Sequence, residues 1–164
     1  MTTPITPCLW FDSDLEEAVR FWTSVFPNSS IGTIHRATPG GALPEGSVMA
    51  ADWVMNGLAC RGINGGPIYA GFTETVSFAV DCADQAEVDR YWDALTADGG
   101  EESQCGWLKD RFGLSWQIVP TRLYQLMQDP NPARAAAATQ AMLSMTRIVV
   151  ADLEKAADEA APAN

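Results

Sequence analysis

The chain has 164 residues, of which 47% are hydrophobic and 19% are charged, a balance that supports a folded core and argues against intrinsic disorder. Its formal net charge of -11 argues against nucleic acid and anionic membranes as partners, because binding to phosphate relies on lysine and arginine. No apolar stretch approaches the length of a membrane span. The first residues, MTTPITPCLWF, lack a basic, signal-like start, which predicts a cytoplasmic protein.

The first 70 residues predict the order strand, helix and three strands. The predicted elements are a strand at 5–11, a helix from about 15 to Phe26, and strands at 30–37, 47–55 and 58–64. The helix should end near Phe26, because Pro27 disfavours helical backbone in the residue before it. Asn56 and Gly57 separate the last two strands and predict a two-residue hairpin turn, whose central residues both need positive φ.

The same order of elements follows in the second half. The predicted elements are a strand at 74–82, a helix from Asp84 to about Leu95, a short strand near 101–103, and two runs, CGWLKD and LSWQIVP, joined by a hairpin loop at 111–113. The helical stretches DLEEAVRFW (14–22) and DQAEVDRYW (84–92) share Asp, Glu, Arg and Trp at matching positions. We interpret the chain as a tandem pair of βαβββ modules, residues 1–70 and 71–120, of the α+β class.

Residues 121–164 do not repeat either module and are predicted as a C-terminal helical extension. PARAAAATQAMLSM (132–145) has proline at its start and is rich in alanine, which indicates a helix, and a second helix should follow Asp152. The apolar stripe on the first of these helices fits either internal packing or a dimer surface. The four cysteines are widely separated and are expected to be buried, reduced side chains.

Several segments resemble one known family. They include ITPCLWF, GSVMAADWVMNG, SFAVDC, CGWLKDRFGLSWQIVP and DPNPARAAAATQAML, and they are similar to the PhnB-like branch of the glyoxalase/bleomycin-resistance/dioxygenase (vicinal oxygen chelate) superfamily. Members of this branch often carry a demethylubiquinone methyltransferase label. The resemblance runs from Ile5 to about Met145. It implies two half-barrels that build a small-molecule cavity, within one chain or across a dimer. Open sheet edges in such half-barrels also favour a homodimer.

In metal-dependent members of the superfamily, His, Gln and Glu side chains hold a divalent metal in that cavity. The resemblance places Pro7, Arg61, Thr75 or Ser77, and Gln117 at the corresponding positions of this chain. Arginine cannot act as a ligand, because it stays protonated. Its repulsion of a doubly charged ion ~4 Å away is on the order of 8 kcal/mol at an effective dielectric constant of ~20. We therefore expect no cofactor and no usual metal site, with a metal held by other ligands as the alternative.

The same residues suggest a ligand-binding site instead. Arg61 is expected to clamp an anion, unless it forms a structural ion pair, while Thr75, Ser77 and Gln117 supply hydrogen bonds. Trp53 and Trp116 fit either an apolar wall of this site or the core. His35 is expected to be exposed or packed. The predicted function is binding of a small polar or anionic metabolite, with enzymatic activity left open. The alternatives are a metal-dependent glyoxalase or dioxygenase, and a resistance-type protein that sequesters a small molecule.

Two further expectations concern a cysteine nucleophile and a nucleotide cofactor. Cys105 and Lys109 are four residues apart on one predicted strand, so they should share a face, where the lysine could activate the thiol as a nucleophile. No histidine is at hand to act as a base, and the sequence favours a surface turn at Lys109 and Asp110 instead. The chain contains no glycine-rich loop between a strand and a helix. Because such a loop holds the cofactor in parallel nucleotide-binding folds, the sequence argues against binding of S-adenosylmethionine in that manner.

Overall fold

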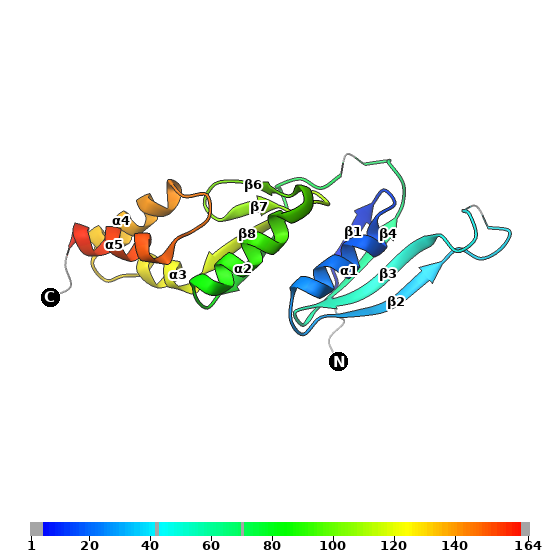
Figure 1. Cartoon of the computed structure of the whole chain (residues 1–164), viewed down its shortest axis with the longest axis horizontal. Coiled ribbons are helices and arrows are strands. Elements are labelled where there is room, and N and C mark those ends of the chain that lie inside the picture. Colours follow the sequence, from blue (N-terminus) through cyan, green and yellow to red (C-terminus); the bar gives the residue numbers. More distant parts are fainter. Residues whose placement is uncertain (1–4, 42, 70, 162–164) are drawn as a thin grey trace. The chain divides into compact units, whose positions relative to one another are not determined.

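The computed structural model describes residues 5–41, 43–69 and 71–161. The chain divides into two compact units, residues 1–71 (the N-terminal unit) and 72–164 (the C-terminal unit). Each unit contains a four-stranded mixed sheet and a helix in the order βαβββ, so the predicted α+β fold is confirmed (Figure 1). Residues 1–4, used in the prediction of a cytoplasmic protein, and residue 70, the predicted end of the first module, lie outside the described residues.

The N-terminal unit has the strand order β1-β4-β3-β2, in which β1 runs parallel to β4 and the other pairs are antiparallel. Its elements are β1 (Cys8–Phe11), α1 (Leu15–Val25), β2 (Ser30–Arg36), β3 (Val48–Met55) and β4 (Leu58–Asn64). Asn56 and Gly57 have φ of 44° and 84°, as the predicted hairpin turn requires. The Asn64 side chain accepts a hydrogen bond from the Leu15 amide at 3.1 Å, and so ties the start of α1 to the end of β4.

The core of the N-terminal unit lies between the sheet and α1. The rings of Trp22 on α1 and Trp53 on β3 are 5.9 Å apart, and Phe11 is 5.9 Å from Trp22. Side chains alternate along a strand, so Asp52, next to Trp53, points to the other side of the sheet. That other side is called the Arg61 face below, because Asp52 and Arg61 are directly paired across β3 and β4.

The C-terminal unit repeats the arrangement with the strand order β5-β8-β7-β6. Its elements are β5 (Ser77–Cys82), α2 (Gln85–Thr96), the short 3₁₀ helix η1 (Ala97–Gly99), β6 (Glu101–Glu102), β7 (Trp107–Lys109) and β8 (Ser115–Pro120). Asp84 accepts a hydrogen bond from the Glu87 amide, and the Glu87 side chain accepts one from the Ala83 amide. This reciprocal pair satisfies two donors that a helix start leaves open, and it fixes α2 at its predicted position.

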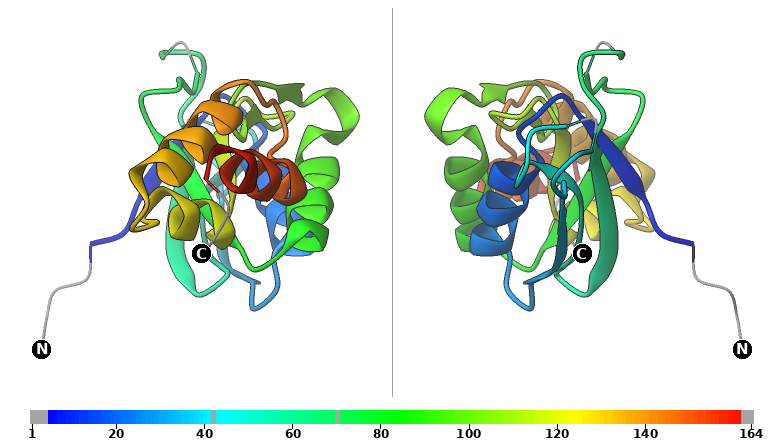
Figure 2. Two further views of the ribbon diagram at one scale, coloured as in Figure 1. Left: turned by 90° about the vertical axis from the view of Figure 1, so that its left-hand side faces the viewer. Right: turned by 90° about the vertical axis from the view of Figure 1, so that its right-hand side faces the viewer.

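Three helices follow the second module and form a small core with the end of β8. They are α3 (Thr121–Met127), α4 (Pro132–Leu143) and α5 (Val150–Ala160), drawn in yellow to red in Figure 2. Two of them match the predicted helices, whereas α3 was not predicted. The core residues are Val119, Leu123, Leu126, Ala138, Ile148, Leu153 and Ala157, with Met142 and Met145 packed against them. Internal packing therefore accounts for these two methionines, while Leu143 is half exposed.

The described part of the chain contains no helix that combines the length and the apolar character needed to traverse a lipid bilayer.

Candidate functional site

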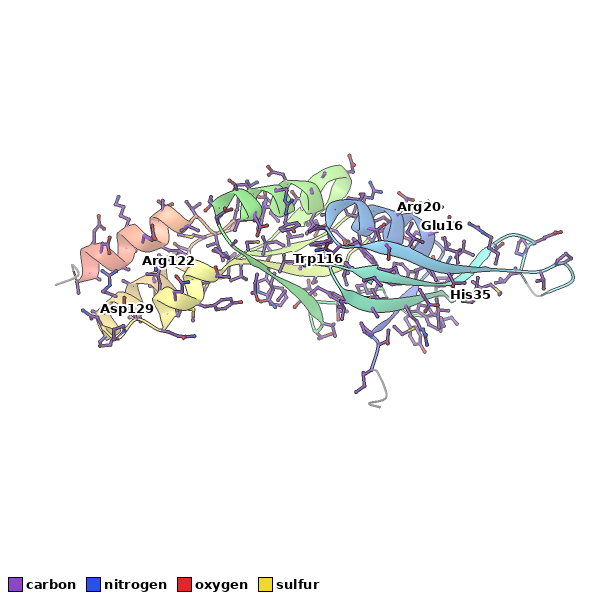
Figure 3. All side chains as sticks on the ribbon, turned by 90° about the horizontal axis from the view of Figure 1, so that it is seen from below. Glu16, Arg20, His35, Trp116, Arg122 and Asp129 are labelled. Atoms are coloured by element: carbon purple, nitrogen blue, oxygen red, sulfur yellow. The ribbon has the colours of Figure 1, made fainter. Side chains whose placement is uncertain are left out.

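Three polar side chains meet on the Arg61 face of the N-terminal sheet. Arg61 Nε lies 3.1 Å from Asp52 Oδ1, and His35 Nε2 lies 3.7 Å from Asp52 Oδ2. They come from β4, β3 and β2 respectively, and Figure 3 labels His35 on the last of these strands. The Arg61 side chain is 59% exposed. Asp52 is thus the centre of a solvent-accessible cluster that combines an anion, a cation and an imidazole.

This geometry corrects one part of the sequence reasoning. Arg61 forms the ion pair that was its alternative interpretation, and its partner is Asp52. Because the carboxylate offsets the guanidinium charge, the repulsion of a divalent metal is far smaller than expected for an isolated arginine. Asp52 itself was not singled out from the sequence. Its direct cross-strand pairing with Arg61 follows from the predicted hairpin at Asn56 and Gly57, so a signal for it was present.

On the C-terminal sheet, the structure brings two of the predicted site residues together. Gln117 on β8 donates a hydrogen bond from Nε2 to Ser77 Oγ on β5 at 2.8 Å. The parallel register pairs Ser77 with Ser115 and Ala79 with Gln117, so these side chains share one side of the sheet, called the Gln117 face. Thr75 instead lies in the turn before β5, where its hydroxyl is 2.6 Å from that of Thr73. Arg61 belongs to the other unit.

The two tryptophans of the predicted site lie in the cores of their units. Trp53 is 2% exposed and packs against Trp22 of α1, on the side of the sheet opposite Arg61. Trp116 is 1% exposed, lies on the side of β8 opposite Gln117, and has its ring 5.5 Å from that of Phe78. Neither ring shares a face with the polar residues of the predicted site. Core packing, the other interpretation of both residues, is therefore the one we adopt.

Lys109 and Asp110 do not form the surface turn that was one expectation. Lys109 ends β7, and its Nζ lies 2.5 Å from Glu74 Oε1. This hydrogen bond is the main cause that lowers the pKa of the Glu74 carboxyl and raises the pKa of the Lys109 ammonium. Asp110 is buried and accepts a hydrogen bond from the indole N–H of Trp116 at 2.9 Å. Asp110 therefore acts inside the core, as an acceptor for a buried donor.

The C-terminal unit also contains a pocket of about 490 Å³ beside the Gln117 face. This volume falls within the range of small-molecule sites in proteins. Most of the residues that line it are of polar or charged types. The lining residues are Glu74, Glu101, Glu102, Ser103, Gln104, Cys105, Trp107, Leu108, Lys109 and Ser115. The sequence predicted Cys105 and Lys109 on one strand, but β7 begins only at Trp107, and Cys105 lies before it in a turn with φ of 60°. The pocket itself was not predicted.

The residues at the predicted ligand positions do not fit a divalent metal. In the described ranges 5–41, 43–69 and 71–161, no three His, Cys, Asp or Glu side chains are grouped so that they could hold one. The Arg61 face offers the imidazole of His35 and the carboxylate of Asp52, and that carboxylate is bonded to a guanidinium. The Gln117 face offers a neutral amide and hydroxyls. Neutral oxygens are weak partners for a divalent ion compared with carboxylates and imidazoles.

Comparison with known proteins places the chain in a family. The model of the 3-demethylubiquinone-9 3-methyltransferase family matches residues 3–119. The PhnB protein of Bacillus cereus is similar in structure, with 32% identity and a TM-score of 0.65 over 72% of this chain and 99% of that one. The Pseudomonas aeruginosa protein PA1353 has 22% identity and a TM-score of 0.61, over 73% and 98% of the two chains.

The fosfomycin resistance protein FosX of Listeria monocytogenes shares the fold, with 15% identity and a TM-score of 0.50 over 73% of this chain and 93% of that one. None of the curated proteins matches the chain. The helices α3, α4 and α5 lie beyond the matched residues 3–119. The chain therefore belongs to the PhnB-like 3-demethylubiquinone-9 3-methyltransferase family.

Proposed function

We propose that this protein binds a small polar or anionic metabolite without the metal used by other branches of the superfamily, with Ser77 and Gln117 as binding residues of the C-terminal unit and Arg61 as a separate anion-binding group of the N-terminal unit. The observation that carries the proposal is the hydrogen bond from Gln117 to Ser77, two residues that the sequence resemblance assigns to ligand positions of metal-dependent relatives. An amide that is held by a neighbouring hydroxyl keeps its carbonyl oxygen in a fixed direction. Thr75, in the turn before β5, is the fourth member of the proposed set.

Arg61 would supply the charge in this proposal. A guanidinium carries five N–H donors, and the bond to Asp52 uses the one on Nε. The two terminal nitrogens carry the donors that suit bidentate binding of a carboxylate or phosphonate. An anionic ligand would also be repelled by Asp52. Asp52 therefore weakens anion binding in this account, and its removal is a direct test.

The family description does not by itself assign methyl transfer to this chain, because one fold supports many reactions. The strand-to-helix connections, residues 12–14 and 83–84, contain no glycine. They therefore lack the phosphate-binding loop of nucleotide cofactors. FosX has been crystallised with Mn(II) and sulfate, but a likeness at 17% identity supports the fold alone. The alternatives to this proposal are a metal-dependent enzyme and a resistance-type protein that sequesters a small molecule.

The test is calorimetric titration of the purified chain with methylphosphonate, oxalate and pyruvate in chelator-treated buffer. Arg61→Ala should weaken binding of the best of these anions, whereas Asp52→Asn should strengthen it several-fold by removing a nearby like charge. Arg20→Ala is the matched control, since Arg20 is an exposed arginine of the same unit in an ion pair with Glu16 (Figure 3). Equal effects of Arg61→Ala and Arg20→Ala would reject the role of Arg61.

The same proposal includes a cytoplasmic homodimer. Each sheet has two edge strands in the described residues, β1 and β2 in one unit and β5 and β6 in the other, and open edges favour pairing or coverage. All four cysteines are free thiols, which suits a reducing compartment. Light scattering at micromolar concentration should give twice the chain mass of 17.7 kDa. A monomer mass at that concentration would exclude the dimer.

A further inference from the structure

The pocket beside β7 carries an unusual buried group. Ser115 is 1% exposed and lines the pocket, and its hydroxyl has no hydrogen-bond partner among the residues that the structure describes. A buried hydroxyl without a partner loses its contacts with water and gains nothing in return, so it lowers stability. Such groups are rare in folded proteins, and each calls for an explanation. A bound ligand that completes the hydrogen bond is one such explanation.

The charge around this hydroxyl indicates which ligand would be accepted. Lys109 is paired with Glu74, which balances both charges. Two further carboxylates, Glu101 and Glu102, line the same pocket. Glu101 is the cross-strand neighbour of Lys109, whereas Glu102 accepts a hydrogen bond from the indole N–H of Trp92 at 2.7 Å. The pocket is therefore net negative, and it favours a cation over an anion.

The remaining walls add apolar surface and a fixed rim. Trp107 provides an aromatic side chain on the same side of the sheet as Lys109 and Glu101. The rim at residues 103–105 is held by the segment that joins α4 to α5. In that segment, the Met145 carbonyl accepts a hydrogen bond from the Cys105 amide at 2.7 Å, and the Thr146 carbonyl accepts one from the Gly106 amide at 2.8 Å. The rim thus depends on residues beyond the family match at 3–119.

We propose that this pocket is a binding site for a small cationic amine with an aromatic or apolar body and one hydroxyl or carbonyl group. The ammonium group lies against Glu101, the apolar body lies against Trp107, and the polar group completes the hydrogen bond of Ser115. The site shares no residue with the function proposed above, because Arg61, Ser77 and Gln117 do not line this pocket, although it adjoins the Gln117 face through Ser115, the cross-strand neighbour of Ser77.

Three probes that share one aromatic body but differ in charge separate the effect of charge on binding from the effect of shape. They are tyramine, which is a cation, tyrosol, which is neutral, and 4-hydroxyphenylacetate, which is an anion. Titration of the full chain should show saturable binding of tyramine at one site, weaker binding of tyrosol and the weakest binding of the anion. An anion that binds as tightly as tyramine, or no binding of tyramine up to about 10 mM, would overturn the proposal.

Two variants and one control locate the site. Glu101→Gln should weaken tyramine by about five-fold and leave tyrosol unchanged, because only the cation uses the carboxylate. Ser115→Ala should weaken both probes without loss of folded structure, since it removes a hydroxyl that has no partner within the described residues. Glu159→Gln removes an exposed carboxylate of α5 in the same unit and serves as the matched control. Equal effects of Glu101→Gln and Glu159→Gln on tyramine would overturn the placement of the site.

Discussion

Replacement of Asp110 by alanine should destabilise the C-terminal unit more than the loss of any exposed acidic residue. The hydrogen bonds that this buried carboxylate accepts include those from the Phe112 amide at 2.9 Å, the Leu114 amide at 3.1 Å and the Trp116 indole at 2.9 Å. Hydrogen bonds to a charged group contribute about 1.5–3 kcal/mol each. Because the three bonds share one acceptor group, their losses do not add fully, and we expect a total of about 3–5 kcal/mol.

The Asp110→Asn variant tests the hydrogen bond to Trp116 separately from those to the backbone amides. Asp110→Asn keeps an oxygen for the two backbone amides, but it turns an N–H donor toward the N–H donor of Trp116. The expected cost is about 2–3 kcal/mol. In a Trp116→Phe background the opposing donor is absent, so the same change should cost at least about 1 kcal/mol less.

Urea unfolding followed by far-ultraviolet circular dichroism measures both quantities: Asp110→Ala gives the total loss, and the wild type, the two single variants and the double variant of the cycle give the coupling between Asp110→Asn and Trp116→Phe. Glu159→Ala, at an exposed position, should stay within about 0.5 kcal/mol of the wild type. A loss below about 1 kcal/mol for Asp110→Ala, or additive effects of Asp110→Asn and Trp116→Phe, would refute the role assigned to this carboxylate.

Three other predictions follow from local geometry. Gly106 has φ of 81°, and a Cβ there would lie 2.8 Å from a backbone carbonyl oxygen, so Gly106→Ala should lower the free energy of unfolding by about 2–4 kcal/mol in thermal melts. Gly66 has a similar φ of 80° but open space around it, so Gly66→Ala should lower the free energy of unfolding by only about 1 kcal/mol. In Lys109→Met, the pKa of the Glu74 carboxyl should rise toward the ordinary value of 4.5 in an NMR titration, because its lowering depends mainly on the bond to Lys109. A carboxyl whose pKa is lowered in the folded state stabilises the fold at pH values above its ordinary pKa. This contribution to stability is lost as the pH falls through the folded-state pKa, so the stability difference between the two chains should vanish in acid. Burial raises the thiol pKa to about 11 for Cys60 and about 12 for Cys82, so a thiol reagent at pH 8 should label these two cysteines only after unfolding. The same reagent should label Cys8 and Cys105 in the native chain.

The elements of the fold were largely predictable because their signals are local. The Asn56-Gly57 turn, the N-cap at Asp84 and the repeated helical stretch each act within a few residues, and the structure contains all three. The helix α3 was missed because it has only seven residues and no side-chain cap. The cysteines were expected to be buried, but Cys8 is exposed at the start of β1, where no neighbouring element covers it in the described chain.

The candidate site was harder to predict, because its contacts join distant parts of the sequence. The hydrogen bond between Gln117 and Ser77 spans 40 residues, and only the family resemblance assigned these two residues to one site. The position of Trp53 could have been predicted more sharply. Along β3 the buried residues Ala51, Trp53 and Met55 alternate with the partly buried Asp52 and Val54. Every second residue of such a strand faces the core. The pocket around Ser115 and Lys109 had no local signal, because four separate segments build it.

The central claim is that Gln117 and its neighbours bind an anion without a metal. Calorimetric titration of the wild type and Gln117→Ala with methylphosphonate and with Mn²⁺, in chelator-treated buffer, tests it most directly. Gln140→Ala, an exposed glutamine of α4, is the matched control. The account predicts that the wild type binds methylphosphonate in the absence of metal, that Gln117→Ala weakens this binding, and that Mn²⁺ shows no stoichiometric binding. Tight binding of one Mn²⁺ per chain that Gln117→Ala abolishes, with methylphosphonate bound only after Mn²⁺, would contradict it.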